Sequence, residues 1–217
     1  LHVRSRRQRQ MCIRDSIETG IAKPEDTPGF ARKIHVEASR MIQLVNDILQ
    51  LSHLDNVSET GAAPAMETVD LLDVARECVE RQKVNARHSY ISLTYLGESA
   101  PVTGSRVLLD ELCQNLCDNA IRYNRPGGKV QIITACTRDG HCTLTVKDNG
   151  IGIPKEAQTS VFERFYRVDK SRSKATGGTG LGLAIVKHIG RIHNARIKLD
   201  SVVDEGTTIT VIFETAS

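Results

Sequence analysis

The sequence has no apolar run long enough to span a membrane and no pattern typical of a signal peptide. Its six cysteines form neither a CxxC pair nor a Cys/His metal spacing, so we expect reduced thiols in a cytosolic setting. The glycine-rich stretch 177–182 lacks the Lys-Ser/Thr pair of a P-loop, and no strand-forming run leads directly into it, as a Rossmann motif requires. With 217 residues and 40% hydrophobic content, the chain suits one domain with an appendage.

Positive charge gathers at the start of the chain, where residues 1–16 hold five arginines and one acidic residue. The remaining 24 basic and 25 acidic residues give the rest of the chain a net charge of −1, which does not favour a nucleic-acid partner. Residues 6–15 (RRQRQMCIRD) resemble the translation of a transposase adapter used in preparing sequencing libraries. We therefore expect residues 1–16 to be an adapter-derived, disordered tail. A basic arm for RNA or anionic lipid is the alternative.

A long helix is predicted from Gly29 to about Asp55, because apolar residues recur there at intervals of four and three. The seam consists of Ile34, Ala38, Met41, Val45 and Ile48. It is typical of one helix in a coiled coil or four-helix bundle, and further apolar residues beside it predict burial on two sides. We expect residues 17–57 to be the remnant of a helical dimerisation hairpin with a truncated first helix, through which the chain forms a homodimer. Residues 58–65 are expected to be a linker.

The chain from residue 66 to residue 217 alternates strand and helix patterns. Strands are predicted at 67–71 and 91–95, helices at 72–85, 105–123 and 181–189, and hairpins at 130–137/142–147 and 196–201/207–213. Ser105 is a plausible N-cap of the helix that follows it. The pattern predicts an α+β fold, a two-layer α/β sandwich with a mixed sheet on one face and helices on the other.

Two glycine clusters predict a ligand site. The stretch 177–183 opens onto a helix, where glycines let the backbone approach a ligand and N–H groups at a helix N-terminus favour phosphate. Upstream, a strand delivers Asp148 onto the Gly-x-Gly turn 150–152. Asn115 and Asn119 lie four apart on one helical face, and their amide oxygens suit Mg²⁺. Structural caps or core hydrogen bonds are the alternative for these two asparagines.

Four segments resemble, in order and in spacing, the nucleotide-binding motifs of sensor histidine kinases. Residues 115–120 (NLCDNA) resemble the N box, 148–152 (DNGIG) the G1 box, 162–167 (FERFYR) the F box and 178–183 (GTGLGL) the G2 box. Residues 40–54 resemble the second helix of the family's dimerisation domain. The resemblance covers residues 17–217 and implies the Bergerat ATP-binding fold, which this family shares with gyrase and the heat-shock chaperone ATPases.

The resemblance implies ATP and Mg²⁺ as ligands. Asp148 would accept a hydrogen bond from the adenine amino group, which guanine cannot supply. Asn119, assisted by Asn115, would hold Mg²⁺, while phosphate charge would be met by basic and hydroxyl side chains. The predicted cofactor-binding residues are Asn115, Asn119, Arg122, Tyr123, Asp148, Gly150, Gly152, Ile153, Phe162, Phe165, Lys170, Gly178, Thr179, Gly180, Leu181, Gly182 and Leu183. The predicted catalytic residues are Asn115 and Arg167, and the predicted metal ligands are Asn119 and Asn115.

The polar run between Asn149 and Gly177 is expected to form a mobile lid over the nucleotide, with Phe162 and Phe165 anchoring it to the core. A solvated basic loop is the alternative. In the ATPase relatives a Glu four residues before the metal-binding Asn activates water, whereas this chain has Asn115 there. Hydrolysis should therefore be slow, leaving the γ-phosphate for a histidine acceptor. Glu111 lies one turn further back and should not substitute.

The acceptor motif of the family, a His followed by Glu or Asp, is absent. His35 and His53 lie on the predicted long helix, but neither is directly followed by an acidic residue. We expect the chain to bind Mg-ATP without phosphorylating itself. A parent kinase anchored at the cytoplasmic face of the membrane would phosphorylate its own dimer and pass the group to a response-regulator receiver domain. The alternative is a catalytically silent ATP-binding or dimerisation module of the same superfamily.

Overall fold

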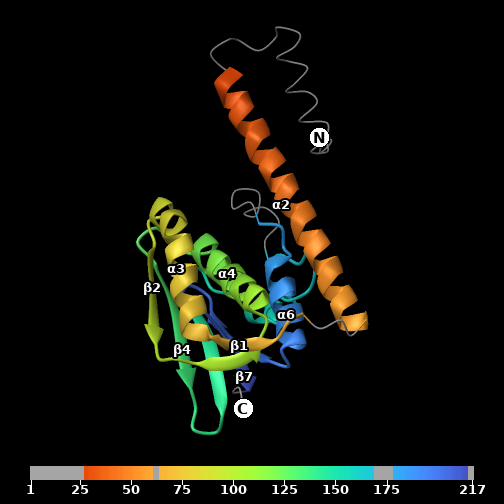
Figure 1. The fold of residues 1–217 in the computed structure, drawn as a ribbon. Helices are drawn as coiled ribbons and strands as arrows, with labels where there is room; N and C mark the ends of the chain where they lie inside the picture. The colour runs from red at the N-terminus through yellow and green to blue at the C-terminus, as the bar shows by residue number, and fades with distance from the viewer. Residues whose placement is uncertain (1–26, 61–63, 169–177, 215–217) are drawn as a thin grey trace. The chain divides into compact units, whose positions relative to one another are not determined.

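The computed structural model describes residues 27–60, 64–168 and 178–214 (Figure 1). The chain divides into two compact units, residues 1–46 and residues 47–217. The second unit contains all the strands and holds the predicted nucleotide site. No helix among the described residues is both long enough and apolar enough to cross a lipid bilayer.

Helix α2 (Thr27–Thr60) runs through the long helix predicted from the apolar seam. It ends five residues later than expected, because residues 56–60 contain neither glycine nor proline and the first glycine is Gly61. Burial on two sides was predicted for this helix within a bundle; in the single chain Ile42 and Leu49 are each 63% exposed. Leu51 and Leu54 at its C-terminal end are buried. The helix therefore keeps an apolar stripe in solvent, and the predicted homodimer stays a prediction.

A mixed sheet forms one layer of the second unit. Its strands are β2 (Ser92–Gly97), β4 (Lys129–Cys136), β5 (His141–Asp148), β7 (Gly206–Glu214) and β6 (Arg196–Val202), in that spatial order. Strands β2 and β4 are parallel and the other neighbours are antiparallel. The register pairs Val130 with Asp148, which places Asp148 at the end of β5. The predicted mixed sheet is confirmed.

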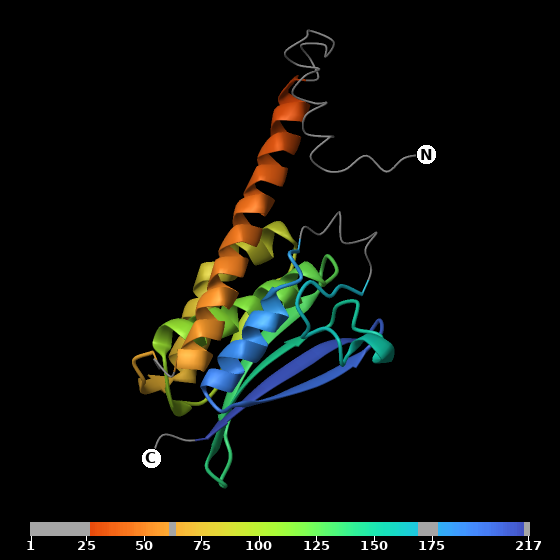
Figure 2. The ribbon, with the colours of Figure 1, turned by 90° about the vertical axis from the view of Figure 1, so that its right-hand side faces the viewer.

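Helices α3 (Leu71–His88), α4 (Arg106–Arg122) and α6 (Gly182–Ile192) form the second layer on one face of this sheet (Figure 2). The core lies between the layers, where alternate strand residues such as Ile132, Leu144 and Val211 meet Leu112 and Ile185. A short strand, β3 (Pro101–Gly104), pairs with β1 (Glu67–Asp70), and a 3-10 turn spans Lys155–Ala157. Sequence patterns did not predict β3 or the 3-10 turn.

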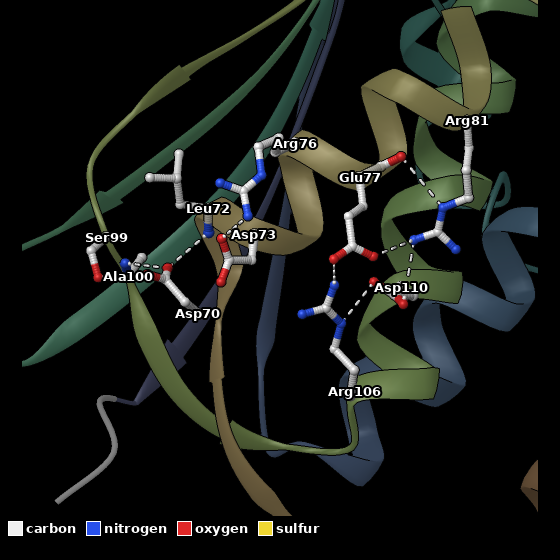
Figure 3. A network of polar contacts seen from close by, with 10 residues as sticks. All are labelled: Asp70, Leu72, Asp73, Arg76, Glu77, Arg81, Ser99, Ala100, Arg106 and Asp110. Atoms are coloured by element: carbon white, nitrogen blue, oxygen red, sulfur yellow. Dashed lines mark hydrogen bonds and ion pairs between the residues drawn. The ribbon is translucent and has the colours of Figure 1, made fainter.

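Asp70 fixes the start of α3 (Figure 3). Its carboxylate accepts hydrogen bonds from Leu72 N at 2.9 Å, Ala100 N at 2.8 Å and Ser99 Oγ at 2.6 Å. Burial by itself would raise the pKa of Asp70, but these hydrogen bonds lower it below its ordinary value. Ion pairs also join α3 to α4, from Arg106 Nη2 to Glu77 at 2.7 Å and from Arg81 to Asp110 at 3.4 Å. These pairs align the two helices, although exposed pairs of this kind add about 1 kcal/mol at most.

Ser105 precedes α4 as predicted, but its side chain makes no capping hydrogen bond within the described chain. Its backbone N–H instead donates to Nε2 of His193, 3.0 Å away. Because Nε2 accepts this bond, Nδ1 carries the proton of the neutral ring, and it lies 2.8 Å from the carbonyl of Ile189. Burial lowers the pKa of His193, which favours this neutral form. One half-buried imidazole therefore ties the start of α4 to the end of α6.

The cysteines differ from the sequence prediction. Cys136 and Cys142 oppose each other across the β4–β5 hairpin and form a disulfide, whereas all six were expected to be reduced. The prediction failed because residues six apart in the chain become direct cross-strand partners only in this register. Cys78, Cys113 and Cys117 are free thiols buried in the α3 and α4 layer.

Candidate nucleotide-binding site

The two asparagines of α4 face the start of α6. A Cβ atom added to Gly182 would lie 2.9 Å from Asn115 Oδ1 and 3.5 Å from Asn119 Nδ2. Only glycine allows the two segments to approach this closely. The Asn115 Nδ2 group donates to the carbonyl of Glu111 at 3.0 Å, so its amide oxygen is turned toward the glycine segment. The structure thus brings together two residues predicted as metal ligands and the G2 box.

One turn further along α4, Arg122 and Tyr123 face Gly178. A Cβ atom at Gly178 would lie 3.0 Å from a guanidinium nitrogen of Arg122 and 3.3 Å from the hydroxyl of Tyr123. Segments more than fifty residues apart in the chain therefore form one row, with cationic and amide side chains on α4 and glycine backbone opposite. Such a row suits a phosphate chain, because both sides offer hydrogen-bond donors.

Asp148 occupies the end of β5 beside this row. Its Oδ1 accepts hydrogen bonds from Gly150 N at 2.8 Å and Thr207 N at 3.3 Å. Its Oδ2 accepts no hydrogen bond from the residues that the structure describes. Burial raises the pKa of Asp148, and the two backbone donors oppose part of that shift. Gly150 packs against the Tyr123 carbonyl, where a side chain would overlap, so the turn after Asp148 is held against the end of α4.

Gly180 contacts the F box through backbone. Phe165 N donates to the Gly180 carbonyl at 2.9 Å, and Gly180 has a positive φ of 79° that favours glycine. The side chain of Phe165 is 58% exposed, so the prediction that it anchors the lid to the core is wrong. Phe162 is half-buried. The F box is therefore held in place at this point by main-chain hydrogen bonding rather than by burial of the Phe165 ring.

Several residues of the predicted site or lid already bond to other parts of the protein or are buried in its core. The hydroxyl of Thr179 donates to Asp47 Oδ2 at 2.6 Å, and Arg164 of the expected lid pairs with Asp55 at 2.8 Å. Leu181 is fully buried in the core, and Ile153 N donates to Ser201 Oγ at 2.8 Å. These residues offer a nucleotide no free side chain or, for Ile153, no free N–H.

The remaining predicted residues are Gly152, Leu183, Arg167 and Lys170. Gly152 packs with a positive φ of 68° against the carbonyl of Val202, at the end of β6. Leu183 and Arg167 are half-buried. Lys170 and the rest of residues 169–177 of the expected lid lie outside the described residues.

A divalent cation at this site would meet amide oxygens rather than carboxylates. Among the described residues, no group of three His, Cys, Asp or Glu side chains could hold a metal ion. The outward amide oxygen of Asn115, with Asn119 one turn away, fits a hard cation that keeps several water ligands.

Sequence reasoning missed one contributor and one property of a residue that it had already considered. The β6–β7 turn, read only as a hairpin turn, donates to Asp148 through Thr207. Glu111, one helical turn before Asn115, has its pKa raised to about 7 by burial, against a hydrogen bond with Gln50 and with a smaller contribution from Asp47. Neither follows from local patterns, because both depend on contacts between distant segments.

The fold is an α/β sandwich in which α4, two glycine segments and the carboxylate at the end of β5 lie close together, an arrangement that suits a nucleotide. A family described as histidine kinase-, DNA gyrase B-, and HSP90-like ATPase matches residues 104–217. The chain is 43% identical over 193 residues to the sensor-like histidine kinase SenX3 of Mycolicibacterium smegmatis, covering 87% of this chain and 48% of that protein. It is 36% identical over 199 residues to the sensor protein kinase WalK of Staphylococcus haemolyticus, covering 91% of this chain and 32% of that protein.

Among solved structures, the mycobacterial sensor histidine kinase MprB is 32% identical, with a TM-score of 0.60 over 69% of this chain and 97% of that chain. The chain therefore belongs to the histidine kinase-, DNA gyrase B- and HSP90-like ATPase family. Its relatives are sensor histidine kinases, so the resemblance drawn from the sequence motifs is confirmed. The chain spans about half or less of the length of these curated relatives.

Proposed function

We propose that residues 47–217 bind Mg-ATP and form the kinase core of a sensor histidine kinase, which transfers the γ-phosphate to a histidine. The observation that carries this proposal is the row made by Asn115, Asn119 and Arg122 against Gly182 and Gly178, with Asp148 at its side. A carboxylate for the base, donors for the phosphates and amides for a cation thus come from three separate segments and converge on one place.

The base would be selected at Asp148. Oδ1 is already engaged by two backbone N–H groups, so Oδ2 remains for the exocyclic amino group of adenine. Guanine presents a carbonyl oxygen at that position and would face the carboxylate without a proton between them. Leaving a buried acceptor unpaired costs about 1–3 kcal/mol, which corresponds to a preference for ATP over GTP of roughly tenfold to a hundredfold.

The phosphates would lie along the row on α4. Arg122 supplies a guanidinium, Tyr123 a hydroxyl, and the glycine backbone leading into α6 supplies N–H groups at a helix N-terminus. Asn115 and Asn119 would hold Mg²⁺, whose charge offsets that of the phosphate oxygens. The side chains fix the direction in which the γ-phosphate leaves, and transfer then depends on an incoming nucleophile in line with it.

Transfer rather than hydrolysis follows from the residue types at this end of the site. Asn115 cannot accept a proton from water, and Glu111 is a full turn away with one buried carboxylate oxygen that has no hydrogen-bond partner among the described residues. Asp118, which lies between the two asparagines in the chain, accepts a hydrogen bond from Gln82 Nε2 at 2.6 Å and is therefore already engaged. An incoming histidine needs no such base, because a neutral imidazole nitrogen already carries a lone pair.

The partners proposed on this footing are a histidine-bearing dimerisation helix and the receiver domain of a response regulator. The relatives are named sensor kinases, which supports partners of this kind in general terms. The exposed apolar positions of α2, among them Met41, Ile42 and Val45, support pairing with a second copy of the chain.

The proposal is tested by calorimetric titration with Mg-ATP, followed by incubation with γ-labelled ATP and a separately supplied acceptor domain from a sensor histidine kinase. We expect binding, and acid-labile label on the acceptor. Asn119→Ala should abolish labelling, while Asp200→Asn, a change at an exposed strand residue paired with Lys198, should leave it intact. Binding without transfer would instead support the silent ATP-binding module. Absence of binding would overturn the proposal.

A further inference from the structure

The hydroxyl of Ser201 takes part in three hydrogen bonds beside the candidate nucleotide site. Ser201 lies near the end of β6, and its Oγ accepts from Ile153 N at 2.8 Å. The same hydroxyl donates to the Gly206 carbonyl at 2.9 Å and lies 2.9 Å from Thr207 Oγ1. A serine hydroxyl has only one proton, and the Gly206 carbonyl takes it, so the Thr207 hydroxyl must be the donor in the third bond.

These bonds fasten the β6–β7 turn to the segment that follows Asp148. Ile153 N is held by Ser201 at one end of the turn, and Asp204 N donates to the Ile151 carbonyl at 2.9 Å at its tip. Gln158 adds two further bonds, to the carbonyls of Ser201 at 2.8 Å and Ile153 at 3.0 Å. The two loops are therefore bonded to each other at several points, and Ser201 is one of the side chains that bond to both.

The turn reaches the carboxylate directly. Ser201 donates to the Gly206 carbonyl, and the next amide along the chain is that of Thr207. This amide donates to Asp148 Oδ1 at 3.3 Å. Gly206 itself packs against the Asp148 carbonyl so closely that any side chain would overlap. A hydrogen bond of 3.3 Å is near the limit of useful length, so a shift of a few tenths of an ångström in the turn would remove it.

We propose that Ser201 is a positioning residue for base recognition: its hydroxyl holds the β6–β7 turn where Thr207 N can orient the Asp148 carboxylate. The inference rests on the proposed ATP binding and adds to it a residue in neither glycine motif. It predicts that loss of the hydroxyl weakens recognition of the base and leaves recognition of the phosphates unchanged.

The test compares Ser201→Ala with the unsubstituted chain and with Thr145→Val. Thr145 makes a hydroxyl pair with Thr210 at 3.1 Å on strands β5 and β7, so this control deletes a similar buried hydrogen bond that does not touch Asp148. We expect Ser201→Ala to weaken ATP and adenosine about tenfold and to reduce the preference for ATP over GTP. Tripolyphosphate binding should stay within about twofold of wild type, and Ser201→Thr, which keeps the hydroxyl, should restore ATP affinity.

Amide exchange measured by NMR without nucleotide gives a second readout. In Ser201→Ala the Ile153 and Thr207 amides should exchange faster, and in Thr145→Val they should not. Unchanged ATP affinity in a folded Ser201→Ala protein, or equal losses for ATP and tripolyphosphate, would overturn the inference while leaving the proposed function intact. Wild-type protein that does not bind ATP at all would overturn both, and it is recognised before any variant is made.

Discussion

The two ends of the candidate site are built differently. At the base end, Asp148 accepts hydrogen bonds from the backbone N–H groups of Gly150 and Thr207. The loops that supply these groups are bonded to each other. At the phosphate end, the α4 side chains of Arg122 and Tyr123 are exposed and lie against glycine backbone. The main chain therefore fixes the base end before a ligand arrives. The phosphate end relies instead on exposed side chains that remain available to a ligand. Substitutions at the two ends should therefore fail in different ways.

The largest effect is expected at the base end. Asp148→Asn replaces one carboxylate oxygen by an NH₂ group, which would oppose the amino group of adenine rather than accept from it. We expect ATP affinity to fall by about 100-fold, equivalent to about 2.7 kcal/mol, with a smaller loss for GTP. Titration calorimetry with both nucleotides measures this. A parallel loss for ATP and GTP would show that Asp148 does not read the base.

Gly182→Ala should damage the phosphate end alone. The added Cβ would lie 2.9 Å from Asn115 Oδ1, so the asparagine must move or the start of α6 must retreat. We expect roughly tenfold weaker binding of ATP and tripolyphosphate, with adenosine affected little. Gly29→Ala is the matched control, because a Cβ there meets nothing within 4 Å. Equal weakening of adenosine would mean that the two ends are not separable.

A pH effect should come from Glu111, beside the phosphate end. Burial raises its pKa from 4.5 to about 7, so the folded protein favours the protonated carboxyl. The stabilisation is therefore full below the ordinary pKa and is lost as pH rises through about 7. Allowing for partial solvent screening, the free energy of unfolding should drop by about 1 kcal/mol between about pH 5 and pH 8 through this group. Urea unfolding at several pH values should show a flatter profile for Glu111→Gln than for wild type, and identical profiles would contradict the assignment.

The smallest effect is expected from Asp204→Asn at the tip of the β6–β7 turn. Asp204 forms an ion pair with Arg125, but its side chain is 75% exposed, and the turn is held to Ile151 by the backbone N–H that the substitution keeps. ATP affinity should change less than about twofold. Fluorescence titration with a labelled nucleotide suffices to measure this. A large loss would show that the ion pair, rather than the main chain, prearranges the base end.

Local patterns predicted much of this architecture. Period-two alternation located β4 and β5, and the three- and four-residue spacing of leucines located α4, with Leu109, Leu112 and Leu116 buried. The glycine clusters and the asparagine pair marked segments that the structure does bring together. These features could be read because each depends on residues within one element.

The features that escaped depend on register and on contacts between distant elements. Strand β3 begins with Pro101 and ends with Gly104, residue types that favour turns, and Ser105 could not be known to bond to His193, 88 residues away. The exposure of Phe165 and the bond from Thr179 to Asp47 depend on how the F box and the start of residues 47–60 lie within the second unit. Ser201 carries no motif, because its role arises only when the β6–β7 turn meets the loop after β5.

The parallel pairing of β2 with β4 has a consequence for assembly. Parallel neighbours cannot be joined by a tight turn, and the chain between them contains α4, the helix that bears Asn115 and Asn119. The α4 residues of the phosphate end therefore lie on the connection between β2 and β4, which are about thirty residues apart in the chain. Both ends of this connection are fixed only after the two strands have paired. Pairing of strands that lie far apart in the chain is slow compared with formation of a local hairpin. Nucleotide capture during refolding should accordingly lag behind formation of the β4–β5 and β6–β7 hairpins.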